Sequence, residues 1–191
     1  MSRRWKKPLP RSMLPKHHLA VVLKDKFPDS FLEITDFRDM LTIHIRGAKV
    51  LDLLRTLKTD PRFAFNFLAD ITAVDHLGTG GHARFAVVYH LLNQYEAQRI
   101  VIRAWVDEEH PSLPSVCPLW KTADWQEREV YDLFGIEFSG HPDLRRIMNP
   151  DDFQYHPLRK DYPLQGRGER SNFPVIKRCI GSKWQEEKSL E

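Results

Sequence analysis

The chain has 191 residues, of which 41% are hydrophobic and 29% are charged, with a formal net charge of +3. This length suits one globular domain with an extension, and no apolar run approaches the roughly 18 residues that a membrane-spanning helix needs. The two cysteines, Cys117 and Cys179, form no Cys-x-x-Cys pair. Their spacing argues against a disulfide framework, a cysteine-ligated iron–sulfur cluster and a structural zinc site, and reducing, intracellular conditions are the simplest interpretation.

Basic residues are concentrated at the N-terminal end. Residues 1–26 carry eight Lys or Arg residues against one acid, Asp25. No apolar segment follows them, which excludes a secretory signal, and three prolines within the first fifteen residues would break the amphipathic helix of a mitochondrial presequence. We interpret residues 1–15 as a basic arm that is solvated or contacts a partner protein. Contact with anionic lipid or nucleic acid is the alternative.

The spacing of apolar residues predicts helices and strands in a definite order. We expect a helix over 16–27, strands over 31–37 and 40–45, a helix over 48–57, strands over 65–74, 85–92 and 99–106, and a helix over 120–135. Short turns between neighbouring strands predict antiparallel pairing, with the helices packed on one face. The predicted fold class is therefore α+β, a two-layer sandwich of a mostly antiparallel sheet and helices, formed by residues 16–138.

Two histidine-containing stretches resemble metal-binding or phosphate-binding sites, but we predict a structural role for both. His44 lies on the polar side of an alternating strand, so we expect an exposed side chain. The glycine-rich run 78–81 lacks a following Gly-Lys-Ser/Thr and a following helix, so we predict a hairpin turn and no phosphate loop. His76 and His82 flank that turn like a metal pair, but no third ligand or carboxylate cluster is near them in sequence. We assign no metal.

The last predicted helix has Thr122 as a candidate N-cap and Gly135 as a candidate C′ residue. Its apolar face is predicted to consist of Val130, Leu133 and Phe134. The recurrence of polar or amphipathic residues at helical spacing predicts a second, opposite face formed by Trp125, Arg128, Glu129 and Asp132. Glu127 and Glu129 are two residues apart and should therefore point to different sides.

Residues 139–191 have a different character. Prolines are scattered among charges and no periodicity survives, so over fifty residues lack the means to build their own core. Frequent aromatic and aliphatic residues nevertheless argue against disorder. We predict a long, extended C-terminal arm that wraps on a partner surface and has no stable structure without it.

Three motifs in this part of the chain are long and specific. They are Glu127-Arg128-Glu129-x-x-Asp132-x-x-Gly135-Ile136, Gly140-His141-Pro142-Asp143-Leu144-Arg145-Arg146-Ile147 and His156-Pro157-Leu158-Arg159-Lys160-Asp161. The stretch 125–164 that contains them closely resembles the C subunit of the proton-pumping NADH:quinone oxidoreductase, respiratory complex I. The mitochondrial iron–sulfur protein 3 subunit belongs to the same family.

The resemblance implies a non-catalytic subunit of the peripheral arm, docked on the quinone-site subunit beside cluster-bearing subunits. It implies a role in assembling the complex that couples NADH oxidation and quinone reduction to proton translocation. It places the chain peripherally on the cytoplasmic side of a bacterial inner membrane, or on the matrix side of an organelle. It implies no catalytic residue, cofactor or metal in this chain, with FMN and iron–sulfur clusters held by other subunits.

The motif residues are the predicted partner-docking set: Glu127, Arg128, Glu129, Asp132, Gly135, His141, Pro142, Asp143, Arg145, Arg146, His156, Pro157, Arg159, Lys160 and Asp161. Within this set we expect the acidic helix face and the basic residues of the arm to be pinned to each other or to partner carboxylates, with arginine favoured for its bidentate geometry. The alternative is two solvated charge runs, each worth little.

Other functions are less well supported by the residues. An equivalent subunit of a related membrane-bound hydrogenase or other-donor quinone reductase is the nearest alternative. Nucleic-acid binding through the basic arm is opposed by the acids among the tail's bases, which would repel phosphate. A soluble enzyme using His141 or His156 with Glu129 lacks a nucleophile-and-base set and a cofactor loop. Beyond Gly166 the sequence departs from the family's usual tail, so tail contacts there are not carried over.

Overall fold

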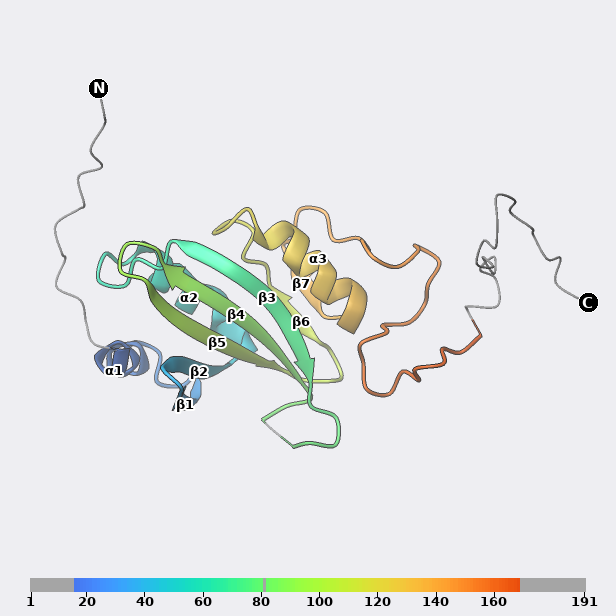
Figure 1. Ribbon diagram of the computed structural model, residues 1–191, viewed down its shortest axis with the longest axis horizontal. Helices are drawn as coiled ribbons and strands as arrows, with labels where there is room; N and C mark the ends of the chain where they lie inside the picture. The colour runs from blue at the N-terminus through green and yellow to red at the C-terminus, as the bar shows by residue number, and fades with distance from the viewer. Residues whose placement is uncertain (1–15, 81, 169–191) are drawn as a thin grey trace, which may run out of the picture.

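The computed structural model describes residues 16–80 and 82–168, so the predicted basic arm (1–15) and the last part of the predicted C-terminal arm (169–191) lie outside the described residues (Figure 1). The elements are α1 (Lys16–Lys26), β1 (Phe31–Phe37), β2 (Met40–Arg46), the 3-10 turn η1 (Gly47–Lys49), α2 (Val50–Thr59), β3 (Phe67–Asp75), β4 (Phe85–Asn93), β5 (Gln98–Val106), β6 (Ser112–Pro114), α3 (Ala123–Phe134) and β7 (Glu137–Ser139). The predicted helices and long strands are confirmed to within a few residues.

Five strands form a mixed sheet in the order β1-β2-β5-β4-β3. The pairs β1–β2, β3–β4 and β4–β5 are antiparallel, as the short turns predicted. The central pair is parallel, with Leu41 opposite Ile100 and Arg46 opposite Trp105. The sequence did not reveal this pair, because parallel partners are joined by a crossover. Here the crossover consists of α2 and the β3–β4 hairpin.

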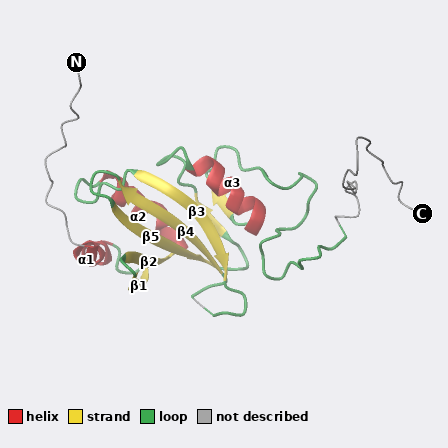
Figure 2. Cartoon of the chain, viewed as in Figure 1, coloured by secondary structure: helices red, strands yellow, loops and turns green. Residues whose placement is uncertain are grey.

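The three helices and one face of the sheet enclose a single apolar core. Leu23 of α1, Leu54 of α2 and Val130 of α3 join Ile102 and Tyr89 of the sheet in one cluster of buried side chains. The helix α2 lies behind the sheet in the view of Figure 1, and α3 lies beside β3 (Figure 2). The architecture is therefore α+β, and it fixes α3 next to the β3–β4 hairpin.

A second, two-stranded sheet pairs β6 with β7 in parallel. The sequence analysis predicted neither strand, because three-residue strands show no periodicity. The ends of α3 also differ from the prediction at one point. Thr122 occupies the N-cap position as predicted, but its side chain makes no capping hydrogen bond. Gly135 ends the helix in the left-handed conformation with φ 70°, as predicted.

The loop between β3 and β4 confirms the predicted hairpin turn. Gly78 and Gly80 both have φ of 74°, a conformation that favours glycine. From Gly140 to Gly168 the chain contains no helix or strand. We call residues 140–168 the arm.

Candidate functional site: the interface between α3 and the arm

Helix α3 buries charged side chains where the sequence predicted a polar face. Trp125 and Glu129 are exposed, but Asp132 is fully buried and Arg128 is 7% exposed. Glu127, on the other side of the helix, is also fully buried. The predicted single polar face is therefore wrong, because the arm covers one side of it.

Asp132 is the centre of the contact between α3 and the arm. Its carboxylate forms an ion pair with Arg146 at 2.7 Å and accepts hydrogen bonds from the backbone N–H groups of Ile147, Met148 and Asn149 and from the Asn149 side chain. Burial by itself would raise the pKa of this carboxyl, but the bonds from Asn149, Met148 and Arg146 lower its pKa to about 2. One carboxylate thus fixes the path of four consecutive arm residues.

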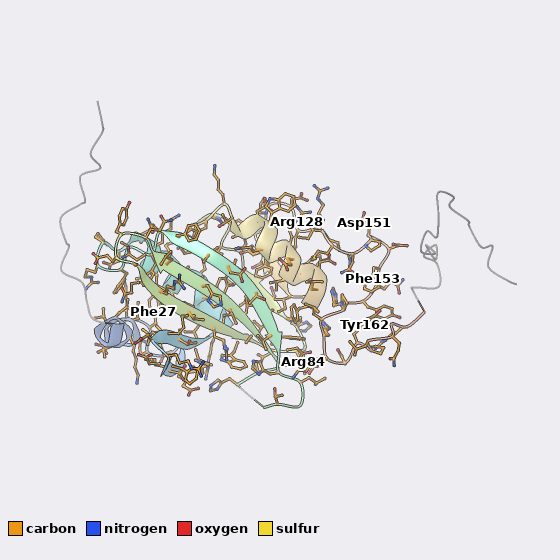
Figure 3. All side chains as sticks on the ribbon, in the orientation of Figure 1. Phe27, Arg84, Arg128, Asp151, Phe153 and Tyr162 are labelled. Atoms are coloured by element: carbon orange, nitrogen blue, oxygen red, sulfur yellow. The ribbon has the colours of Figure 1, made fainter. Side chains whose placement is uncertain are left out.

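Arg128 of α3 holds the same segment from the helix side (Figure 3). Its guanidinium donates to the backbone carbonyls of Arg145 and Arg146 at 3.1 and 3.3 Å and lies over the Trp125 ring. The Arg145 side chain instead points to the surface, where it pairs with Asp143. Of the two adjacent arginines, only Arg146 pairs with an acid of the helix among the described residues.

The third motif caps the C-terminal end of α3. His156 donates from Nδ1 to the Asp132 carbonyl at 2.9 Å, and Arg159 donates from Nε to the Phe134 carbonyl at 2.6 Å. The last carbonyls of a helix have no partner within the helix, so these bonds satisfy them. Burial lowers the pKa of His156, which favours the neutral ring. A Cβ at Gly135 would lie 2.5 Å from the His156 ring and 2.6 Å from Arg159.

The last two residues of the third motif, Lys160 and Asp161, attach the arm to the β3–β4 hairpin. The Lys160 N–H donates to the buried Asp75 carboxylate at 2.9 Å. Arg84, at the other end of the hairpin loop, forms ion pairs with Asp75 at 3.1 Å, with Asp161 at 2.9 Å and with Glu108. Sequence reasoning missed Asp75 and Arg84, because 85 residues separate Asp75 from Lys160.

Glu127 holds a different segment, the crossing between β6 and α3. Glu127 accepts hydrogen bonds from the Ser115 hydroxyl and the Val116 N–H, both at 2.7 Å, and lies beside the Cys117 thiol. Burial raises the pKa of Glu127 and raises that of Cys117 to about 11, so the thiol is not a nucleophile at neutral pH.

Cys117, Glu127 and His141 are close enough for a metal to bridge them, but the hydrogen bonds oppose it. The His141 Nδ1 accepts from the Asp143 N–H, so its Nε2 carries the proton and donates to the Asp124 carbonyl. A protonated nitrogen offers no lone pair to a metal.

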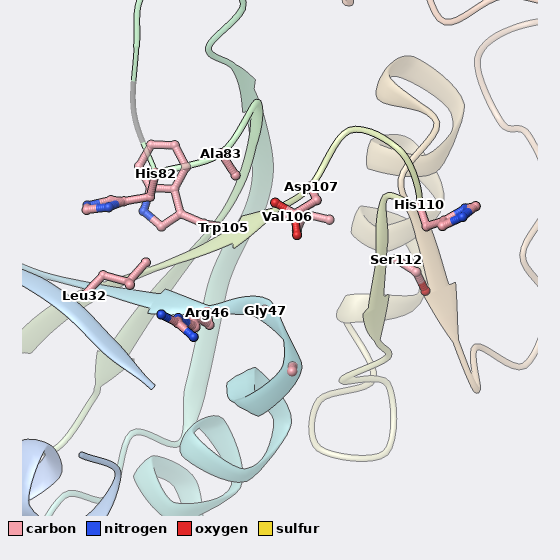
Figure 4. Close-up of a pocket in the computed structure, with 11 residues that line it drawn as sticks. Leu32, Arg46, Gly47, His82, Ala83, Trp105, Val106, Asp107, His110 and Ser112 are labelled. Atoms are coloured by element: carbon pink, nitrogen blue, oxygen red, sulfur yellow. The ribbon is translucent and has the colours of Figure 1, made fainter. Parts of the chain in front are cut away.

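A second group of possible ligands lies on the sheet, where Glu33 and His44 approach His82. His44 is 7% exposed, which contradicts the predicted exposed side chain, because Trp105 covers it and donates from Nε1 to its Nδ1 at 3.2 Å. An indole N–H can only donate, so the neutral His44 ring carries its proton on Nε2. This tautomer also opposes metal binding at Nε2. A cavity of about 630 Å³ opens beside His82 and Trp105 (Figure 4).

The remaining predicted docking residues lie at the surface or support the arm. Pro142 and Glu129 are exposed, and Pro157 is half-buried. Between the motifs, the rings of Phe153, Tyr155 and Tyr162 pack edge-on or tilted within 6.1 Å of one another. The arm therefore has side-chain packing of its own, in addition to its bonds with α3. The predicted charge network exists within one molecule, between Asp132 and Arg146, and does not include Glu129.

Comparison with known proteins identifies the family. Residues 43–168, which include all three motifs, match the family described as "Respiratory-chain NADH dehydrogenase, 30 Kd subunit". The chain belongs to this family. It is 45% identical over 154 residues to the NADH-quinone oxidoreductase C subunit of Citrifermentans bemidjiense, covering 81% of this chain and 93% of that protein. With the C subunit of the Coxiella burnetii enzyme (strain RSA 331) the identity is 35% over 197 residues, covering 88% and 87%.

Solved structures agree with this assignment. The trypsin-resistant fragment (1–134) of Nqo5 shares 38% identity and a TM-score of 0.58, covering 66% of this chain and 98% of the fragment. A chain of an archaeal membrane-bound sulfane sulfur reductase has a TM-score of 0.66 over 90% of this chain and 98% of its own, at 23% identity, which shows a shared fold. The resemblance found in the motifs is thus confirmed, and the chain is a C subunit of NADH-quinone oxidoreductase, in the peripheral arm of complex I. No helix among residues 16–80 and 82–168 is long and apolar enough to cross a bilayer.

Proposed function

We propose that the chain is a non-catalytic docking subunit that binds the quinone-site subunit of complex I and supports assembly of its hydrophilic arm. The observation that carries this proposal is the contrast between the two kinds of residue in the arm. Arg146, His156 and Arg159 contact α3. The apolar side chains of Met148, Leu158 and Leu164 are instead 65, 52 and 95% exposed. Exposed apolar side chains on a chain segment held in place are what a partner surface buries.

The geometry offers no acid–base pair for catalysis at the motif histidines. His141 and His156 each bond to a backbone carbonyl of α3, and Glu129 is exposed elsewhere on the helix. We therefore assign NADH oxidation, FMN and the iron–sulfur clusters to neighbouring subunits, and quinone reduction to the partner on which this chain docks. The chain would lie peripherally on the cytoplasmic side of a bacterial inner membrane, or on the matrix side of an organelle.

The fold shared with the sulfane sulfur reductase chain favours one alternative. The same docking role could be performed in a related membrane-bound complex with another electron donor. The identity of the co-purifying subunits distinguishes the two: complex I supplies NADH-oxidising subunits, and the alternative does not.

The test is affinity purification of the tagged full-length chain from detergent-solubilised membranes, for the wild type, Leu158→Asp and a control, Tyr95→Asp. Tyr95 is 71% exposed and lies at the β4–β5 turn, away from the arm. We expect Leu158→Asp to recover much less of the quinone-site subunit, while the NADH:quinone turnover of each complex that does assemble stays normal. Recovery of the wild-type chain alone from the soluble fraction refutes the proposal, as does normal assembly with lost turnover in Leu158→Asp.

A further inference from the structure

The face of the five-stranded sheet that points away from the helices has an unusual composition. We call it the open face, and the strand registers assign residues to it by alternation with the core. Exposed apolar side chains lie along it: Phe37 is 69% exposed, Phe67 39% and Val74 38%. Val88 and Val101 form its floor at 5% exposure each. The exposed residues lie on the two edge strands, β1 and β3, and the two valines lie on the strands between them, so a partner laid across the sheet would cover all of them.

Arg103 lies in the middle of the open face. Its neighbours across the strands are His44 on β2 and Val88 on β4. Its Nε is buried and has no hydrogen-bond partner, and no carboxylate of residues 16–80 and 82–168 pairs with its guanidinium. A half-buried cation without a carboxylate is costly, and a charge in that position is normally paired.

The polar groups around Arg103 favour an incoming hydrogen-bond acceptor. The tautomer imposed by Trp105 leaves the His44 Nε2 with a proton to donate. Arg46 and Arg99 lie on the same face, which makes three arginines against two carboxylates, Glu33 and Asp70. The excess charge on this face is therefore positive.

The cavity beside Trp105 continues this surface. Trp105 and Arg46 line it together with His82, Asp107 and His110, between β2 and the chain leading to β6 (Figure 4). An inserted side chain of a partner could occupy the cavity while the apolar floor is covered.

We propose that the open face is a second docking surface, and that its occupant is a segment of a neighbouring protein subunit that places a carboxylate beside Arg103 and apolar side chains over Val88 and Val101. This inference rests on the proposed function, because the neighbouring subunit is one supplied by the complex. It is distinct from the contact made by the arm, which lies on the α3 side of the molecule.

The first experiment compares Arg103→Gln with Arg55→Gln in the assembled complex. Arg55 is the control because it is an exposed arginine of α2, which packs on the opposite side of the sheet from the open face. The complex is captured through a tag on this chain and washed at rising salt concentration, and the neighbouring subunits that remain are quantified. Loss of one member of a desolvated charge pair increases dissociation strongly, so we expect at least about a tenfold faster loss for Arg103→Gln. Arg55→Gln should match the wild type within about twofold.

The second experiment needs no change at Arg103. Thr72 is an exposed residue of β3 opposite Val88 on the open face. In a Thr72→Cys chain, maleimide labelling at position 72 is read by peptide mass spectrometry, in the free chain and in the complex. We expect at least about a tenfold slower labelling in the complex, because the partner covers the site. The native cysteines do not interfere, since each is carried by a different peptide.

Each outcome decides the proposal. Equal labelling in the free chain and in the complex, or equal salt resistance of the two arginine variants, overturns the second docking surface while leaving the arm's role intact. A wild-type chain that never co-purifies with other subunits refutes the proposed function and this inference together. If Arg103→Gln proves unstable as a free chain, the test uses Arg103→Lys, which keeps the charge and should retain the neighbouring subunits. The labelling experiment at position 72 does not depend on either variant.

Discussion

Replacing Asp132 with asparagine should release the arm from α3. Lowering a carboxyl pKa from 3.8 to about 2 corresponds to about 2 kcal/mol of folding free energy at neutral pH. Asparagine has nearly the same size but loses the charge that pairs with Arg146. Its amide nitrogen must replace either the oxygen that accepts from all three backbone N–H groups or the oxygen that accepts from Arg146 and the Asn149 side chain. We expect Asp132→Asn to lower the free energy of unfolding by about 2 kcal/mol, and Asp132→Ala by about 3–5 kcal/mol, because it leaves Arg146 unpaired.

The pH dependence has a definite sign. The carboxyl has a lower pKa in the folded chain than in the unfolded chain, so its contribution is fully present above the unfolded value of 3.8. It is lost as the pH falls toward about 2. The difference in stability between the wild type and Asp132→Asn should therefore be largest at neutral pH and shrink through the acid range.

The assay combines urea unfolding with limited proteolysis of the arm in the purified chain. The control is Glu129→Gln, an acid on the same helix that is exposed. We expect Asp132→Asn to shift the unfolding midpoint and to accelerate cleavage between residues 145 and 160, with Glu129→Gln unchanged. If Asp132→Asn and Glu129→Gln are equally stable and equally resistant, Asp132 does not anchor the arm.

Three further changes test neighbouring contacts. Gly135→Ala should destabilise the chain by about 2–4 kcal/mol in the same urea assay, because the added Cβ would clash with His156 and strain the left-handed backbone. A loss below about 0.5 kcal/mol, which is typical of surface changes, would contradict the close approach of His156. Glu127→Gln should lower the free energy of unfolding by less than about 1 kcal/mol, because burial already favours the neutral acid and the amide oxygen still accepts from Val116. Glu127→Ala, which removes the acceptor, should lower it by about 3 kcal/mol. Equal losses in the two variants would refute the role of this acceptor. Tyr89→Phe should raise the thermal midpoint, because the buried hydroxyl has no partner among the described residues, and a lower midpoint means that a bound water satisfies it.

The hydrophobic pattern of the sequence predicted the elements well and their pairing less well. The strand Phe31–Phe37 has the predicted bounds, since alternation and a tight turn define both of its ends. The parallel contact of β2 with β5 depends on where α2 packs, and no local pattern encodes that. His44 shows the same limit: alternation placed it correctly on the face away from the core, but burial came from Trp105, a residue 61 positions away.

The motifs by themselves determined the family, because a long run of specific residues does not arise by chance. What those residues do was decided by the tertiary structure. The sequence alone does not show whether a charged residue faces water, a partner or its own chain. Folding brings Asp132 within 2.7 Å of Arg146 and turns Glu129 outward, although both acids belong to one motif. Burial and hydrogen-bond geometry depend on segments distant in the chain, and they separate the residues that shape the arm from the exposed leucines that we propose meet the partner.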